Sequence, residues 1–319
     1  MKSTKKYLLT LFAVASMATV SVQNLTAGFP LTGADGNSVV QSPVIPASVL
    51  FAGTKIDLDR IDMYERLDRE LTAMTYTHGN TLLLFKRANR YFPEIIPILK
   101  KNGVPEDIVY LACIESTLNP RAYSVAKAAG LWQFIASTAK HYGLEVNEFV
   151  DERYNTEKAT TAACRYLKDA YKKYGNWESV AASYNGGMAR ITKELASQNA
   201  TTAYDLYLVD ETSRYMFRLL AMKLIMENPR EYGFILQSDQ LYQPVRTETV
   251  TVNGPVEDWP TWAKQHGINF MTLREYNPWI RAKSLPNKTG KMYKIKIPNK
   301  DDLKRSTQKK IVYNKNWVY

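Results

Sequence analysis

Helical periodicity dominates the chain from about Leu58 to about Phe234. The first stretch, DLDRIDMYERLDRELTAM, repeats its apolar residues near one helical face. Similar patterns recur in TLLLFKRANRYFPEIIPILKKNG, EDIVYLACIES, TEKATTAACRYLKDAYKKYG and DETSRYMFRLLAMKLIMEN. Glycines at positions 103, 143 and 175 stand where helices would end. The pattern predicts a mainly α protein with an all-helical domain over residues 55–235.

The pattern changes after this domain. TETVTVNG and MYKIKIP alternate polar and apolar residues as strands do. WPTWAKQHG and FMTLREYN, which lie between them, are typical of short helices. We therefore expect a second, small βααβ domain over residues 244–298, followed by a basic C-terminal tail over residues 299–319.

The N-terminal segment has a different organisation. Three lysines precede an apolar run from Tyr7 to Ala18, which is too short to cross a bilayer, since about 20 residues are needed. This predicts a signal peptide over residues 1–27, with a small-x-small cleavage motif at Ser16-Met17-Ala18. No cysteine follows the run, so we expect an exported protein of the periplasm or cell envelope without a lipoprotein anchor. Residues 28–54 are rich in Gly, Pro and Ser, which predicts a linker.

Composition narrows the class of partner. With 319 residues, of which 45% are hydrophobic and 12% aromatic, the chain can bury a core, and neither disorder nor a membrane bundle fits. The net charge of +11 suits an anionic partner, such as a cell-wall polymer or lipid headgroups. Nucleic acid is not expected, because no long basic run is interleaved with aromatic residues.

Neither the cysteines nor the histidines form a metal-binding pattern. His78, His141 and His266 are scattered without ligand spacing, so we expect no metal and no cofactor. Cys113 and Cys164 both lie on apolar stretches. They fit a disulfide in an oxidising compartment, or two buried free thiols.

The stretch IVYLACIESTLNP places an ionisable group, Glu115, next to an apolar helical face. Desolvation disfavours the charged carboxylate, so we expect its pKa to rise, which would make it a usable general acid near neutral pH. The alternative is a helix-end glutamate that turns to solvent or pairs with Arg121. Glu115 alone does not decide between them.

Four short motifs follow one another at and after this position: ES at 115–116 with Ser124 beyond it, AAGLWQF at 128–134, AASYNGG at 181–187 and ETSRY at 211–215. Together they resemble the signature of the lytic transglycosylases of the soluble-transglycosylase, goose-lysozyme-like superfamily. Over residues 56–235 the chain is similar to the membrane-bound lytic murein transglycosylase D family. The resemblance implies a lysozyme-like helical catalytic domain acting on peptidoglycan.

The resemblance also implies a role for Glu115. It would protonate the glycosidic oxygen between N-acetylmuramic acid (MurNAc) and N-acetylglucosamine (GlcNAc). As a carboxylate, it would then accept the proton of the muramoyl 6-hydroxyl, closing a 1,6-anhydro ring without hydrolysis. Asp151, Glu152 and Glu211 are rival second carboxylates, for which capping or surface pairing is the simpler explanation. A hydrolytic muramidase and a non-catalytic glycan-binding scaffold are the alternatives.

The remaining motif residues suit substrate binding. They carry hydroxyl, amide or phenol groups that match sugar hydroxyls and N-acetyl groups: Ser116, Ser124, Gln133, Tyr184, Asn185 and Tyr215. Each tyrosine could instead direct its hydroxyl at Glu115 or pack in the core. Trp132 is expected in the core.

Residues 247–298 resemble a LysM module, with Asn277 at the usual asparagine position and GPVEDW in place of the common loop after the first strand. This implies glycan binding, and the alternative is a fold that only packs on the catalytic domain. The expected partner is therefore the peptidoglycan glycan strand, bound by a monomer. Peripheral membrane association is an open alternative.

Overall fold

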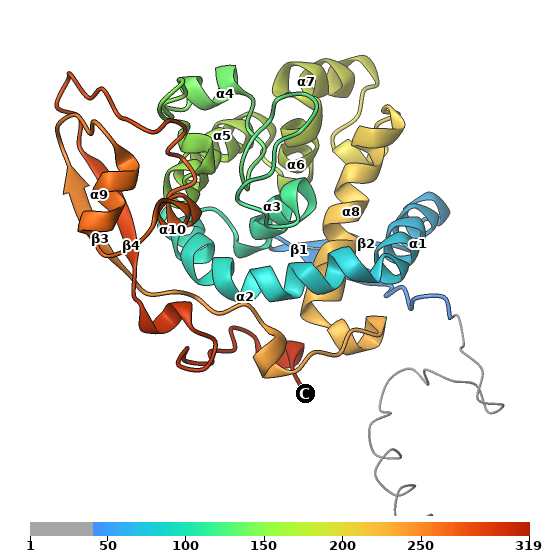
Figure 1. Cartoon of the computed structure of the whole chain (residues 1–319). Coiled ribbons are helices and arrows are strands. Elements are labelled where there is room, and N and C mark those ends of the chain that lie inside the picture. The colour runs from blue at the N-terminus through green and yellow to red at the C-terminus, as the bar shows by residue number, and fades with distance from the viewer. Residues whose placement is uncertain (1–40) are drawn as a thin grey trace, which may run out of the picture. The chain divides into compact units, whose positions relative to one another are not determined.

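Residues 41–319, which the computed structural model describes, are mainly helical, and Pro43–Tyr319 form one unit. The elements in chain order are β1 Ser48–Phe51, β2 Thr54–Asp57, α1 Ile61–Tyr76, α2 His78–Lys101, α3 Val109–Ser116, α4 Ala136–His141, α5 Thr156–Tyr174, α6 Trp177–Gly186, α7 Met188–Ser197, α8 Asp210–Glu227, β3 Thr247–Val252, α9 Trp259–Gln265, α10 Phe270–Tyr276 and β4 Tyr293–Pro298 (Figure 1). The predicted signal peptide lies outside the described residues. Within that part of the chain, no helix is both long and apolar enough to span a membrane.

Helix α8 is the central element of the helical domain. Its sequence is apolar on nearly every side, so it is buried along most of its length, whereas α1 and α5 bury one face. Helices α1, α3 and α6 pack on α8, and α2 packs on α3 and α5. Helix α3 is short and lies in the middle of this group, next to α8 (Figure 1). The predicted mainly α fold is confirmed.

The structure corrects the C-terminal boundary of the predicted linker. Residues from Ser48 onward form a β-hairpin whose Val49, Phe51 and Ile56 are buried in the helical core. Ala52 donates its backbone N–H to the carboxylate of Asp107 over 2.7 Å, which ties the turn to the domain. Four-residue strands give too short an alternation to stand out in the sequence.

Residues 247–298 form the predicted βααβ module. Strands β3 and β4 pair antiparallel from Thr247↔Pro298 to Val252↔Tyr293. Asn277 is buried, donates to the Lys296 carbonyl over 2.8 Å and accepts from the Lys296 N–H over 2.8 Å, so it fixes α10 to β4. The module's core around Trp259 and Leu273 is continuous with three residues of the helical domain: Ala129, Val150 and Tyr154.

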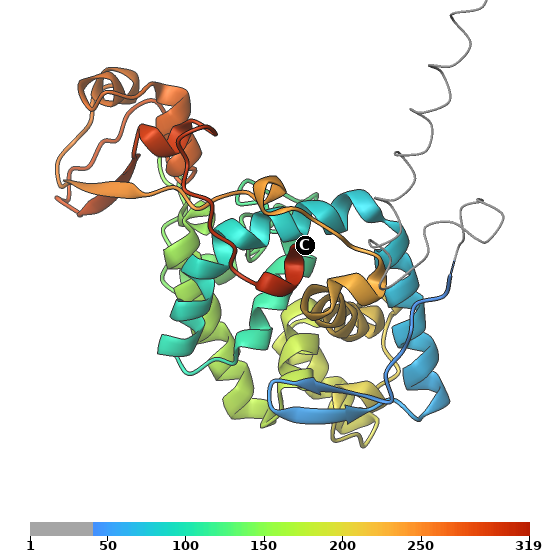
Figure 2. The ribbon, with the colours of Figure 1, turned by 90° about the horizontal axis from the view of Figure 1, so that it is seen from below.

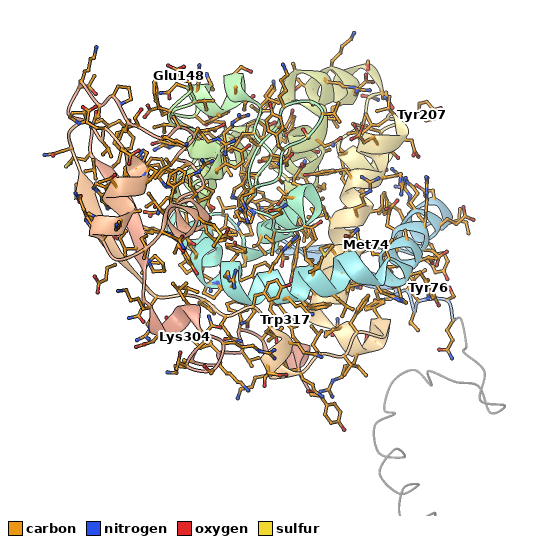
Figure 3. The ribbon with its side chains drawn as sticks, viewed as in Figure 1. Met74, Tyr76, Glu148, Tyr207, Lys304 and Trp317 are labelled. Carbon is orange, nitrogen blue, oxygen red and sulfur yellow. The ribbon has the colours of Figure 1, made fainter. Side chains whose placement is uncertain are left out.

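The expected basic tail, residues 299–319, instead returns to the helical domain (Figure 2). Trp317 is 2% exposed and donates its indole N–H to the Met226 carbonyl over 2.7 Å. The centre of its ring lies 5.8 Å from the ring centres of both Phe85 and Phe92 on α2. Figure 3 labels Trp317, beside α2. Val318 forms a β-bridge with Leu236. The segment contains many lysines and few aromatic residues, so its composition predicted an exposed tail, although its aromatic residue Trp317 is buried in the helical domain.

We predict that Trp317→Ala lowers the free energy of unfolding by about 3–5 kcal/mol, because it leaves a cavity among aromatic rings. Urea denaturation measures the loss. Lys309→Ala, an exposed change in the same segment, should have no measurable effect. Equal stability of the two variants would show that the segment does not anchor the fold.

Candidate active site

Glu115 lies on the last turn of α3, which ends where Thr117 adopts a left-handed conformation with φ 51°. The Glu115 side chain is partly exposed. Tyr215 of α8 donates its phenol hydroxyl to Glu115 Oε1 over 2.6 Å, across 100 residues of sequence. Arg121 pairs with Glu275 at 2.9 Å instead, so the alternative of a Glu115–Arg121 pair is wrong.

The surroundings of Glu115 raise its pKa from 4.5 to about 7. Burial is the largest cause, because it removes water from the charged form. The hydrogen bond from Tyr215 opposes this by stabilising the carboxylate. The negative charge of Glu211 raises the pKa further, and the positive charge of Arg218 lowers it. The group therefore exchanges its proton near neutral pH.

Tyr215 is suited to remain the donor in this pair. It is 3% exposed, and burial and then the charge of Glu115 raise its own pKa well above 10. The phenol is thus protonated over the whole range in which Glu115 titrates. Tyr215 was expected either to bind the sugar or to direct its hydroxyl at Glu115, and the structure shows the hydrogen bond to Glu115.

The segment between α3 and α4, residues 117–135, contains the AAGLWQF motif, and we call it the site loop. Tyr184 of α6 donates its hydroxyl to the Trp132 carbonyl over 2.7 Å, so it holds this loop and does not contact Glu115 by a hydrogen bond. Trp132 itself is fully buried and donates to Thr160 over 2.9 Å, which confirms the expected core position. Ser116 lies within hydrogen-bond distance of the Leu131 carbonyl at 2.9 Å. These contacts place the loop beside the end of α3.

Gln133 sits in the site loop with a left-handed backbone, φ 47°. Its amide nitrogen donates to the Gly130 carbonyl over 2.8 Å, which leaves the amide oxygen as its available polar atom. Ser124 accepts the N–H of Ala128 over 3.1 Å and so closes a turn. Asn185 is partly exposed, and its side chain makes no hydrogen bond within residues 41–319. Substrate contact by these residues stays a prediction.

An interior brace supports the site loop. Arg153 donates through Nη1 to the carbonyls of Lys127 at 2.8 Å and Phe134 at 3.0 Å, and pairs with buried Asp151 at 2.7 Å. A Cβ on Gly130, whose φ is 78°, would lie 1.9 Å from the Arg153 carbonyl oxygen. Glycine is therefore required there. Sequence reasoning missed this brace, since no local period marks it.

The βααβ module extends the brace. Asp151 donates its N–H to the Trp279 carbonyl over 2.9 Å, and Arg281 donates its N–H to the Phe149 carbonyl over 2.8 Å. Val150 and Ile280 form the β-bridge between these two bonds. The segment that holds the site loop is thus itself held by the module.

Of the three acidic residues considered as a second catalytic carboxylate, two are engaged in ion pairs. Asp151 is paired with Arg153, and Glu152 pairs with Lys158 and Lys291. Glu211 was expected to be explained by pairing or capping, but it is exposed and has no ion pair in the described part of the chain. Its visible effect is the electrostatic one on Glu115.

The cysteines form no disulfide in the described part of the chain. Cys113 and Cys164 are buried free thiols, which resolves the open alternative for this structure. Among residues 41–319, no group of three or more His, Cys, Asp and Glu side chains could hold a metal ion.

Two parts of the chain match known protein families. Residues 95–206 match the family model described as the transglycosylase SLT domain. The chain carries an SLT domain. Residues 248–301 match the soluble lytic transglycosylase C-terminal LysM-like domain, which covers the βααβ module.

Some of the similar proteins are peptidoglycan enzymes by name. Membrane-bound lytic murein transglycosylase D of Escherichia coli is 31% identical over 249 residues, which are 76% of this chain and 53% of that protein. The chain thus spans about half the length of this homologue. A peptidoglycan transglycosylase of Escherichia phage T7 is 38% identical over 93 residues, 28% of this chain and 7% of that protein. The solved 70 kDa soluble lytic transglycosylase from Escherichia coli aligns with a TM-score of 0.39 and 19% identity, over 50% of this chain and 30% of that one.

We predict that Gly130→Ala destabilises the SLT domain by at least about 3 kcal/mol, because the new methyl group overlaps the Arg153 carbonyl. Gly175→Ala is the matched control. Gly175 also has a positive φ, 71°, but nothing lies within 4 Å of its Cβ position, so strain alone should cost about 1–2 kcal/mol. Equal losses in urea denaturation would show that the brace does not constrain position 130.

Proposed function

We propose that this chain is a peptidoglycan lytic transglycosylase that cleaves the β-1,4 bond between MurNAc and GlcNAc and leaves 1,6-anhydroMurNAc ends. The observation that carries the proposal is Glu115, a partly exposed carboxyl with a pKa of about 7 that is oriented by Tyr215 at 2.6 Å. A general acid is most effective when its pKa lies near the working pH. The SLT match and the peptidoglycan enzymes among the relatives support this substrate class.

In the proposed reaction Glu115 acts first as an acid. Its proton moves to the glycosidic oxygen as the bond from that oxygen to C1 of MurNAc breaks. The 6-hydroxyl oxygen of the same sugar then bonds to C1, and its proton moves to the Glu115 carboxylate. The carboxyl is thereby restored, and no water is consumed. Tyr215 holds the carboxyl oxygen through both steps.

A single carboxylate suffices only if the substrate supplies the second function. Enzymes that use two carboxylates place both on the scissile bond, whereas in substrate-assisted ones the N-acetyl group takes over one role. Asp151 and Glu152 are engaged in ion pairs, which favours the substrate-assisted route here. Glu211 acts on Glu115 through its charge.

The polar groups around Glu115 are assigned to substrate binding in the same proposal. The amide oxygen of Gln133 and the amide of Asn185 are available for N-acetyl and hydroxyl groups, and Ser116 and Ser124 contribute oxygen atoms that already accept or donate within the loop. Tyr184 and Tyr215 support the site indirectly: Tyr184 holds the site loop, and Tyr215 holds the carboxyl group of Glu115.

The proposed setting is the cell envelope, where peptidoglycan lies. The lysine-led apolar run over residues 1–27 would serve as the export signal. The βααβ module would bind the same glycan strand beside the SLT domain, on which it is docked. We propose a monomer without a cofactor.

We predict that Glu115→Gln folds normally but loses glycan cleavage by at least about 10²-fold, because an amide cannot give or take the reacting proton. Turnover of purified peptidoglycan is measured, with the exposed Glu65→Gln as control. Mass spectrometry of the wild-type products should show ends one water lighter than reducing ends. Reducing ends would identify a hydrolytic muramidase, and absence of cleavage by wild type would leave a glycan-binding scaffold.

We also predict that kcat/KM of the wild type falls as pH rises through about 7, because the protonated acid is lost. Tyr215→Phe removes the hydrogen bond that lowers the pKa of Glu115, so this falling limb should move to higher pH. Activity should drop less than in Glu115→Gln. Tyr171→Phe, a change of an exposed ring, should leave the limb in place. A limb that moves to lower pH in Tyr215→Phe would contradict the assigned role.

A further inference from the structure

Three arginines gather where the βααβ module meets the site loop. Arg121 belongs to the site loop, Arg274 to α10, and Arg281 follows α10 in the module. Arg121 reaches Glu275, the chain neighbour of Arg274, at 2.9 Å. The Arg281 guanidinium lies 4.5 Å from the ring centre of Tyr154, in the segment that braces the site loop. We call these three residues the arginine cluster.

The protein itself uses few of the cluster's hydrogen-bond donors. A guanidinium carries about five N–H groups. Arg274 makes no hydrogen bond in the described part of the chain, and its buried Nε lacks a partner. Arg281 donates from its side chain only a long contact of 3.4 Å, to the Pro278 carbonyl. Arg274 is a partly exposed residue and Arg281 an exposed one, so a ligand can approach both from solvent.

Two of the three positive charges in the cluster, those of Arg274 and Arg281, form no ion pair in the described part of the chain. Among residues 41–319, Glu275 is the one carboxylate that pairs with any of the three, and it pairs with Arg121. Burial lowers the pKa of Arg274, and the positive charges of Arg281 and Arg121 lower it further. The positive charges therefore repel one another at close range, a cost that an anionic ligand would relieve.

A hollow borders the cluster. A pocket of about 370 Å³ is lined by Pro120, Glu275 and Pro278, among other residues. Pro120 precedes Arg121 in sequence, Glu275 follows Arg274, and the carbonyl of Pro278 accepts the hydrogen bond of Arg281. Arg90, Lys296 and Glu94 also line it, and Lys296 pairs with Glu94 at 2.7 Å. The pocket is concave, and residues of both domains line it.

We propose that the arginine cluster binds a carboxylate of the peptide that substitutes the glycan strand, so that the enzyme selects peptide-bearing peptidoglycan. The inference rests on the proposed function. The glycan backbone offers neutral hydroxyl and N-acetyl groups, whereas the stem peptide carries several carboxylates at a distance from the scissile bond. A guanidinium matches a carboxylate through two parallel N–H···O bonds. The cluster joins the site loop, so a strand held at Glu115 places its peptide near the module.

The test uses the full chain and two soluble substrates. One is glycan strands with their stem peptides, and the other is the same strands after carbodiimide-mediated amidation, which neutralises the carboxylates. Amidation should raise KM of the wild type by about three- to tenfold, as expected for exposed charge pairs, with kcat retained. Arg274→Gln and Arg281→Gln should raise KM for the untreated strands and lose most of the response to amidation.

Matched variants separate binding from folding. Arg274→Lys and Arg281→Lys keep the charge without the planar fork and should respond to amidation at an intermediate level. Lys264→Gln removes a charge elsewhere on the module and should behave as wild type. A wild type that ignores amidation, or Gln variants that respond to it as fully as the wild type, would overturn the inference. Neither result affects the proposed function, which is tested separately by the activity of Glu115→Gln and by the mass of the wild-type products.

Discussion

The packing of α8 against the end of α3 is the constraint on which the candidate site depends. It brings Tyr215 within 2.6 Å of Glu115 and at the same time removes water from that carboxyl. The two effects have opposite signs, since burial raises the pKa and the phenol lowers it. Their balance, near 7, lets one group act in turn as acid and base. Either effect alone would favour one protonation state too strongly for both steps.

The site loop obtains its shape from contacts outside itself. A loop with left-handed residues at Thr117, Lys127 and Gln133 is locally unfavourable, so the surrounding structure must hold it. Arg153 does so through two backbone carbonyls, at the expense of burying an ion pair with Asp151. Such a pair is expensive to break, because removal of one partner strands the other charge. This explains why Asp151, an acidic residue in the segment that braces the site loop, is structural.

Periodicity and local chemistry correctly predicted the features that depend on residues close together in sequence. The helices, the βααβ order and the unusual position of Glu115 follow from residues close together in sequence, and all are seen in the structure. The hairpin at Ser48–Asp57 and the anchoring of Trp317 were missed, because each depends on partners far along the chain. Ser124 and Gln133 differ, because their side chains bond to backbone groups of the site loop within four residues, and their contact with substrate stays a prediction. Their polarity predicted a ligand, although a strained loop also needs such groups.

The docked module changes how the two domains are understood. A module on a flexible tether would act on substrate only by raising its local concentration. Here the backbone of Trp279–Arg281 bonds to the segment Phe149–Asp151, and the chain then returns to bury Trp317 in the helical core. A cut after residue 235 would therefore remove core aromatic residues together with the module, and loss of activity would not reveal a binding role. Single substitutions at the surface, which leave both cores intact, are what can separate glycan binding by the module from its support of the site loop.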